Sequence, residues 1–258
     1  HAPLTDEILA GIDHELFPAF AVGVTYTYRK FTDQIFRSRT GLTRDDYVLD
    51  ITDSRPNGLV TGVLPDGTPY SVPLYRIRDG VEVPPGYVYS NRNGYDQTYH
   101  GLDLTLTKRL ANRWMARGSF TYNWNKQHVD AAGCTDPTNI VPGQGADAGN
   151  PQTNYTAQTC ADNVVAGFRS TGSGDKASVF LSSKWQFYLN AMYQLPLGFN
   201  VAGSFFGRQG YPINWFRRIQ GDDGELRDLA VSDLDSERYD DVYDLDLRLE
   251  KVIPITTS

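Results

Sequence analysis

The sequence predicts an all-β fold, an antiparallel segment of a transmembrane β-barrel with seven long strands and long outer loops. Three observations predict it. Apolar and polar residues alternate with a period of two, which places them on opposite faces of a strand. Most alternating stretches exceed a dozen residues, whereas strands of soluble domains usually have about 5 or 6. The connections alternate between short turns and long excursions, as they do in outer-membrane barrels.

Composition agrees with this prediction. The 258 residues are 40% hydrophobic and 12% aromatic, which is typical of a folded, strand-rich chain. Lys plus Arg is 24 and Asp plus Glu is 31, so the net charge is −7, and the absence of a basic stripe predicts no nucleic-acid partner. A spanning strand needs only about 9 to 11 residues with every second one apolar, so a mean hydropathy of −0.43 is compatible with a barrel.

Each predicted strand follows the period-two rule. The fourth is the clearest, because Trp114, Phe120 and Trp124 lie on one face while Arg117 and Thr121 lie on the other. In chain order, the seven strands are predicted at 4–16, 20–36, 97–110, 113–127, 180–195, 199–216 and 239–253. We treat residues 1–258 as a single barrel segment.

The connections fall into two classes. Short turns are predicted at 17–19, 111–112 and 196–198, and long outer loops at 37–96, 128–179 and 217–238. In the first long loop, Asp66-Gly67 separates Leu59–Val63 from residues 70–74, which predicts a small projecting hairpin.

The second long loop contains both cysteines, Cys134 and Cys160, among polar residues. The sequence predicts a disulfide between them, because an outer loop is a poor place for a free thiol. Two unpaired thiols are the alternative. Closing a loop of about 26 residues stabilises by about 3 to 4 kcal/mol in the chain-entropy model and requires an oxidising compartment.

Six stretches carry a resemblance to a known family: TDEI at 5–8, GIDHEL at 11–16, VTYTYRKF at 24–31, YHGLDL at 99–104, KRLANRW at 108–114 and DLDLRLEK at 244–251. Together they resemble the later barrel strands of TonB-dependent outer-membrane receptors, and most of all the Oar-like branch. The resemblance covers nearly all strand segments but not the long loops.

The resemblance implies the C-terminal part of a barrel of about 22 strands in the outer membrane of a Gram-negative bacterium. It also implies an N-terminal plug domain and energy coupling through TonB. The sequence departs from that plan, since it contains neither a plug nor an aromatic residue at its end, where residues 254–258 look like a turn. We therefore expect this chain to be a piece of a longer polypeptide. Contacts with the plug domain and with TonB would be made through the regions of that polypeptide that this sequence lacks.

Residues of catalytic or metal-binding type are scattered. The four histidines, His1, His14, His100 and His128, form no pair at zinc-ligand spacing. Residues 172–176 lack the full phosphate-loop pattern, and no Gly-x-Ser-x-Gly motif occurs. The sequence predicts no catalytic residues, no metal site and no cofactor, so not an enzyme. No sequence motif in the loops identifies a transported substrate.

Two acidic clusters, at 222–225 and 233–241, have no EF-hand spacing. We favour solvated outer-loop charge over a calcium site, with bridging to lipopolysaccharide through divalent ions as a further alternative. The polar faces of the strands also carry charge of both signs, which suits a wall that contacts a plug or lines a wet lumen better than a pore selective for one sign. These inward residues are Arg29, Asp33, Asp103, Arg109, Arg117, Arg208, Asp244, Asp246, Arg248 and Glu250.

Aromatic residues near the strand ends would form interfacial girdles in contact with outer-membrane lipid. They are Tyr26, Tyr28, Trp114, Trp124, Trp185 and Tyr193.

Three functions are compatible with these patterns. The first is a segment of an energy-coupled receptor whose wall and outer loops serve substrate uptake or surface interaction. The second is a passive porin-like small barrel, which needs an eighth strand at 47–51 or Tyr87–Asn91. The third is a secreted β-sandwich adhesin or carbohydrate-binding module, in which the apolar faces pack sheet on sheet.

Overall fold

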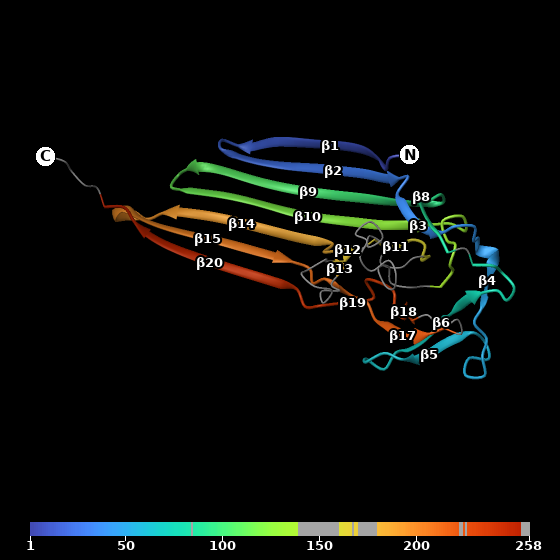
Figure 1. Cartoon of the computed structure of the whole chain (residues 1–258). Helices are drawn as coiled ribbons and strands as arrows, with labels where there is room; N and C mark the ends of the chain where they lie inside the picture. The colour runs from blue at the N-terminus through green and yellow to red at the C-terminus, as the bar shows by residue number, and fades with distance from the viewer. Residues whose placement is uncertain are drawn as a thin grey trace.

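The computed structural model describes residues 1–83, 85–138, 160–166, 168–169, 180–221, 224 and 226–253. It confirms the all-β fold. Seven long strands form one antiparallel sheet in the order β1-β2-β9-β10-β14-β15-β20, and β11 (Val164–Val165) pairs with β10 as well (Figure 1). The seven strands are β1 (Leu4–Phe17), β2 (Phe20–Thr32), β9 (Tyr95–Ala111), β10 (Trp114–Val129), β14 (Trp185–Gln194), β15 (Phe199–Arg208) and β20 (Val242–Lys251).

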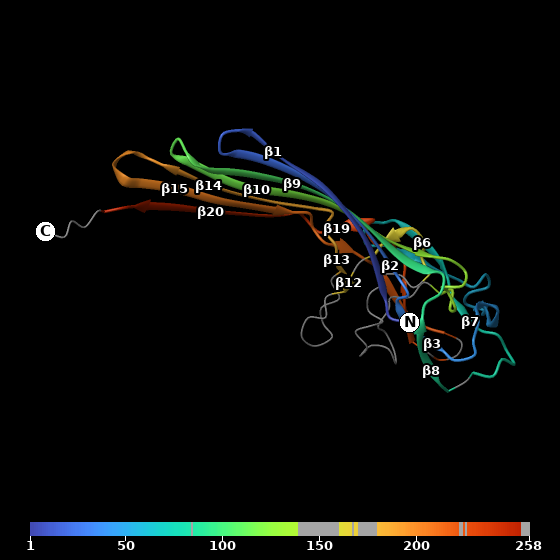
Figure 2. The same cartoon turned by 90° about the horizontal axis from the view of Figure 1, so that it is seen from above.

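The connections are sorted to opposite ends of this sheet. Figure 1 shows the short turns of β1–β2, β9–β10 and β14–β15 at one end, near the last described residues, and the long excursions at the other end with the N-terminus. Figure 2 shows that the strands bend along their length, so the sheet is curved. Every neighbouring pair in the sheet is antiparallel, as short turns between successive strands require.

Left-handed backbone positions make the short turns possible. Between β9 and β10, Asn112 and Arg113 have φ of 54° and 69°. Two successive positive φ values define the type I′ turn, whose twist matches that of the strands it joins. Lys108 supports the same turn, since its Nζ donates to the carbonyl of Arg109 at 2.8 Å.

The strand register confirms the predicted faces. Phe120 of β10 lies opposite Leu104 of β9 and Phe187 of β14, whereas its neighbour Thr121 lies opposite Asp103 and Gln186. Because side-chain direction alternates along each strand, one register produces an apolar row and a polar row side by side. The apolar row crosses the whole sheet through Ile12, Val24, Leu104, Phe120, Phe187, Gly207 and Tyr243.

The apolar face of the sheet is not covered by a second layer of the described residues. Leu247, in the middle of β20, is 77% exposed, and Leu245 and Leu249 are also exposed. The three clusters of buried apolar residues lie at the loop ends of the strands and in the loops. A β-sandwich would place such residues between two sheets, so the described residues do not form the sandwich considered above.

Four predicted strands are shorter than expected, and one of them, predicted at 239–253, is observed as β20 (Val242–Lys251). Strand 20–36 is interrupted at Asp33, which has a φ of 55°, and the chain resumes as β3 (Ile35–Arg39). Strand 180–195 divides into β13 (Phe180–Leu181) and β14, because Ser183 and Lys184 bond to Gln209 instead. Strand 199–216 ends at Arg208, before Pro212, whose missing N–H cannot continue a ladder.

The long excursions contain more structure than expected. The predicted hairpin is present as β5 (Leu59–Val63) and β6 (Pro69–Pro73), and the third loop contains an unexpected one, β17 (Phe216–Gln220) with β18 (Leu226–Ala230). The other pairs are β3 with β8 (Tyr87–Asn91), β4 (Tyr47–Leu49) with β7 (Tyr75–Ile77), β12 (Phe168–Arg169) with β13, and β16 (Pro212–Ile213) with β19 (Glu237–Arg238).

The prediction that residues 47–51 or Tyr87–Asn91 supply an eighth strand of a small barrel was wrong. Neither β4 nor β8 joins the main sheet, because β4 pairs with β7 and β8 pairs with β3. In the described part of the chain, no helix has both the length and the apolar character needed to span a membrane.

A glycine on the apolar face is covered by aromatic rings, which leads to a prediction. A Cβ at Gly207 would lie 2.5 Å from the Phe187 ring and 2.9 Å from the Tyr243 ring. We expect Gly207→Ala to destabilise the protein by about 1–3 kcal/mol through overpacking, measured by urea denaturation. Gly203→Ala is the matched control, since its nearest neighbour is a methyl group of Leu247 at 3.3 Å. Equal effects at both positions would contradict this account of the packing.

Candidate functional site

The long excursions fold together at the loop end of the sheet. We call this assembly the loop cap, and define it as the described parts of residues 33–94, 130–138, 160–184 and 209–241. The predicted outer loops therefore form one packed body at the loop end of the sheet (Figures 1 and 2).

An apolar cluster joins the first excursion to the third. Val60 and Leu74 pack with Leu229 and Val231, and all four are buried. Each hairpin has too little apolar surface to be stable by itself, so burial of this shared cluster holds both. Arg217 adds polar contacts, because its Nη1 donates to the carbonyl of Thr61 at 2.9 Å and to the hydroxyl of Tyr70 at 3.2 Å.

An ion pair between an exposed arginine and a buried carboxylate stiffens the β17–β18 hairpin. Arg218 forms a bidentate contact with Asp228, with distances of 2.9 and 3.0 Å, and the Asp228 side chain is 2% exposed. The hydrogen bond to Asp228 and the charge of its carboxylate raise the pKa of Arg218. A bidentate Arg–carboxylate pair sets orientation as well as charge, and so orients the two strands.

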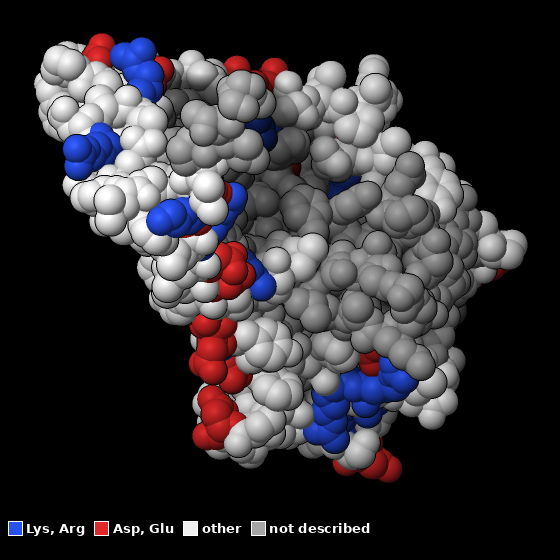
Figure 3. All heavy atoms as spheres, turned by 90° about the vertical axis from the view of Figure 1, so that its left-hand side faces the viewer, with Lys and Arg blue, Asp and Glu red and all other residues white. Residues whose placement is uncertain are grey.

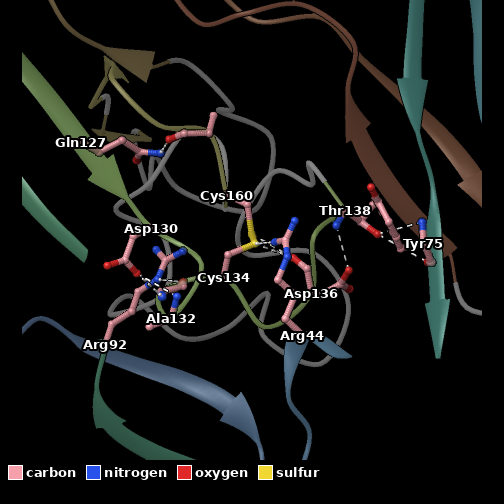
Figure 4. The surroundings of a disulfide bond; sticks show 12 residues. Arg44, Tyr75, Arg92, Gln127, Asp130, Ala132, Cys134, Asp136, Thr138 and Cys160 are labelled. Carbon is pink, nitrogen blue, oxygen red and sulfur yellow. Dashed lines mark hydrogen bonds between the residues drawn. A yellow bond between two sulfur atoms is a disulfide. The ribbon is translucent and has the colours of Figure 1, made fainter. Parts of the chain in front are cut away.

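The disulfide between Cys134 and Cys160, present as predicted, lies where the second excursion meets the first (Figure 4). Nearby, the backbone N–H of Tyr75 donates to the buried Thr138 hydroxyl at 3.2 Å, and Arg92 Nε donates to the carbonyl of Gly133 at 2.7 Å. The disulfide therefore holds a segment that carries these contacts.

Arg92 is largely enclosed at this junction. Its guanidinium lies 4.5 Å from the centre of the Phe36 ring and 4.4 Å from that of Tyr95. Burial lowers the pKa of Arg92 to about 10, so the group stays charged at neutral pH. Cation–π contacts of this kind offset part of the cost of removing the charge from water.

The acidic residues at 233–241 were expected to be solvated charge, and in part this was wrong. Asp235 pairs with Lys184 and Arg238, and Glu237 accepts a hydrogen bond from Trp215 Nε1 at 2.6 Å. Asp241 accepts the backbone N–H of Gly210 at 3.1 Å. These carboxylates connect segments of the cap. Asp222, Asp223 and Glu225, and the stretch 172–176, lie outside the described residues.

The histidines are not brought together into one site. His100 Nδ1 lies 2.7 Å from the hydroxyl of Tyr26, and His128 lies 3.1 Å from the Thr98 hydroxyl and 3.8 Å from an oxygen of Asp162. His14 is exposed on β1. Among the residues that the structure describes, no group of three or more His, Cys, Asp or Glu side chains could hold a metal ion.

The charged residues predicted on the polar face lie on one side of the sheet where they belong to its long strands, whereas Asp33 lies beyond the end of β2. Arg117, Asn190, Ser204 and Asp246 form one cross-strand row. A hollow of about 390 Å³ lies over this row, towards the short turns. Figure 3, viewed from the short-turn end, shows acidic and basic side chains close together along the edge of the molecule. Both signs therefore occur on this wall, as the sequence predicted.

The β5–β6 turn provides a pH-dependent test of the cap. Asp66 accepts the backbone N–H of Thr68 at 2.8 Å and its hydroxyl at 2.9 Å, and these bonds lower the pKa of Asp66. A depressed folded-state pKa means that the stabilisation is present above the unfolded value of about 3.9 and is lost as the pH falls through the folded value.

We expect the Thr68 amide resonance, followed by NMR, to shift and its hydrogen exchange to rise below about pH 4. Asp66→Asn keeps an acceptor that does not titrate, so it should abolish this pH dependence. The same titration in Asp66→Asn and wild type would contradict the assignment.

Comparison with known proteins finds a likeness in structure but no match to a protein family. No protein-family model matches the chain, and no curated protein matches it. A search of solved structures finds the outer membrane transporter YddB from Escherichia coli, at 13% sequence identity and a TM-score of 0.45. The match covers 96% of this chain and 26% of that one, so the chain spans about a quarter of the length of the structure that it is similar to.

Proposed function

We propose that this chain is a section of a TonB-dependent outer-membrane receptor and forms barrel wall and extracellular loops for energy-coupled substrate uptake or surface interaction. The observation that carries the proposal is the apolar face of the main sheet, which no second layer of the described part of the chain covers. Each of the seven long strands of this sheet has at least 10 residues, as a spanning strand requires. A continuous apolar face of this size on a protein in water would favour aggregation, whereas acyl chains would cover it in a bilayer.

The topology supports a wall section of a larger barrel. Seven long strands form the path of the main sheet, with the two-residue β11 beside β10, and both β1 and β20 have a partner on one side only among the described residues. In an antiparallel sheet the first and seventh strands run in the same direction, so closure requires an odd number of further strands. The family resemblance implies about 22 strands, which satisfies this condition.

On this proposal, the loop cap faces the outside of a Gram-negative cell and the apolar face meets outer-membrane lipid and lipopolysaccharide. The polar face meets a plug, and a TonB-contacting segment in other parts of the polypeptide supplies the coupling. The mixed charges on the polar face suit a packed or wet lumen. No residue of the chain is assigned catalytic work or a cofactor.

Quenching by brominated lipid tests the proposal. Variants that keep a single tryptophan, with the other three changed to Phe, are reconstituted in vesicles whose acyl chains carry bromine. We expect quenching of Trp114 and Trp185, which lie on the apolar face, and little quenching of Trp215, which lies in the cap. A chain that is a stable monomer in water without detergent, and whose three tryptophans are equally unquenched, would overturn the proposal in favour of a secreted β-rich module.

A further inference from the structure

Near the loop cap, one edge of β10 pairs with two different strands in succession. β14 pairs with it as far as Tyr122, and the backbone N–H of Asn123 then donates to the carbonyl of Lys184 at 2.7 Å. Further along, β11 pairs with it, and the N–H of Ala166 donates to the carbonyl of Asn125 at 2.9 Å. Trp124 lies between these two contacts. A cavity of about 440 Å³ opens where the two partners diverge, and residues 233–236 form another side of it.

Amide groups are prominent in the lining of this cavity. Asn123, Asn125 and Asn163 come from two separate segments, and Ser182 and Ser236 add hydroxyl groups. An amide presents an acceptor oxygen and two N–H donors, and a hydroxyl both donates and accepts. Part of this capacity is used inside the protein, since Asn123 Nδ2 donates to the carbonyls of Ser183 and Lys184 and Ser236 Oγ donates to that of Asp233. The Oδ1 atom of Asn125 is buried and has no hydrogen-bond partner in the described structure. An unsatisfied buried acceptor of this kind is costly, and because the atom is shielded from the cavity in this state, a ligand hydroxyl would reach it only after the Asn125 side chain turns towards the cavity.

The charges around the cavity largely compensate one another. Lys184 pairs with Asp235, which also pairs with Arg238. Lys126 donates to the Asn163 side-chain oxygen at 2.9 Å, and Asp233 contributes a negative charge. The site therefore has no excess of one sign to attract a phosphate or a cation. Its remaining surface includes apolar side chains, from Val164, Val165 and Leu234.

We propose that this cavity binds a neutral saccharide unit. Sugar hydroxyls donate and accept hydrogen bonds at once, which matches amides and serines, and the C–H faces of a sugar ring suit the apolar lining. The volume lies within the range of about 300–1,000 Å³ that is typical of small-molecule sites. This inference goes beyond the proposed function and does not depend on it, because the cavity is formed by the end of β10 and the cap.

Saturation-transfer NMR on the full chain tests the inference. The probes are maltotriose and cellotriose, and the protein is kept in a detergent without a sugar headgroup so that the detergent does not compete. We expect saturable binding of at least one probe. Asn125→Leu, which removes the unsatisfied amide, should weaken it about tenfold, the effect of losing one well-formed hydrogen bond to the ligand. Ser236→Trp, which fills the cavity from its exposed rim, should abolish it.

Asn190→Leu is the matched control, since Asn190 lies on the polar face of β14 outside the cavity and should leave binding unchanged. Circular dichroism confirms that each variant keeps its strand content. The inference is overturned if neither trisaccharide binds saturably, if Ser236→Trp binds as well as wild type, or if the dipeptide glycyl-leucine binds in place of the saccharides. Each of these results is independent of lipid quenching, so failure here is distinguishable from failure of the membrane proposal.

Discussion

Leu247→Arg is expected to destabilise the membrane-inserted protein by about 2–4 kcal/mol, the cost of an arginine on the lipid face near the bilayer midplane. Leu247 lies in the middle of β20 and is 77% exposed, and it lies opposite Gly203 of β15. The substitution removes no buried protein contact of comparable size. A large loss of stability would therefore come from lipid exposure, and it is measured by urea unfolding in lipid vesicles.

Asp246→Arg is the matched control, because the preceding residue lies on the opposite face and in a row with Ser204 and Asn190. Its effect should be far smaller, since the polar face is expected to meet water or a hydrated plug. If both arginines cost the same, or if Leu247→Arg costs nothing in vesicles, the assignment of the two faces is wrong. The same pair of variants in detergent micelles should show a smaller difference, because micelles adapt to a charge more readily than a bilayer.

The double variant Cys134→Ser with Cys160→Ser is expected to destabilise the loop cap by about 3.5 kcal/mol in the chain-entropy model, given the 26-residue separation of the cysteines. The effect should concentrate on the segment that the disulfide holds. The N–H of Val129 donates to Asp162 at 3.0 Å and that of Ala166 donates to the carbonyl of Asn125. Hydrogen exchange at these two amides should therefore rise strongly.

Amides in the centre of the sheet provide the internal control. Those of Leu104 and Phe120, which form a cross-strand pair, should keep their protection, because no contact of the cap holds them. Wild-type protein treated with a reductant should reproduce the exchange pattern of the double variant. Unchanged exchange at Val129 and Ala166 after loss of the disulfide would show that other contacts of the cap hold this segment.

Predictions that rest on local pattern were confirmed. The faces of β10 follow from alternation alone, because side-chain direction repeats every two residues in any strand. The hairpin around Asp66-Gly67 follows from turn chemistry, since Gly67 has a φ of 90° that favours glycine. The pairing of Cys134 with Cys160 follows from there being only two cysteines in the chain.

Strand ends were predicted less well, for a physical reason. The alternation of residues 199–216 continues beyond Arg208, yet the strand ends there because the chain turns away to form contacts with the cap. Arg238, for example, donates to the carbonyls of Ser182 and Gly210 at 2.6 and 2.8 Å. Periodicity records which way a side chain points, but it does not record whether a neighbouring strand is present to pair with.

By itself the sequence determined the all-β fold, the two faces of the long strands, the division into short turns and long excursions, and the disulfide. Only the tertiary structure decided that the excursions pack into one cap, since Arg217 contacts Thr61 across 156 residues of chain. The tertiary structure alone shows the cavity beside Asn125, and it alone shows that no second layer of the described residues covers the apolar face of the sheet. The reason is that alternation is a property of neighbouring residues, whereas contacts between distant loops depend on how the strands that carry them are arranged in space.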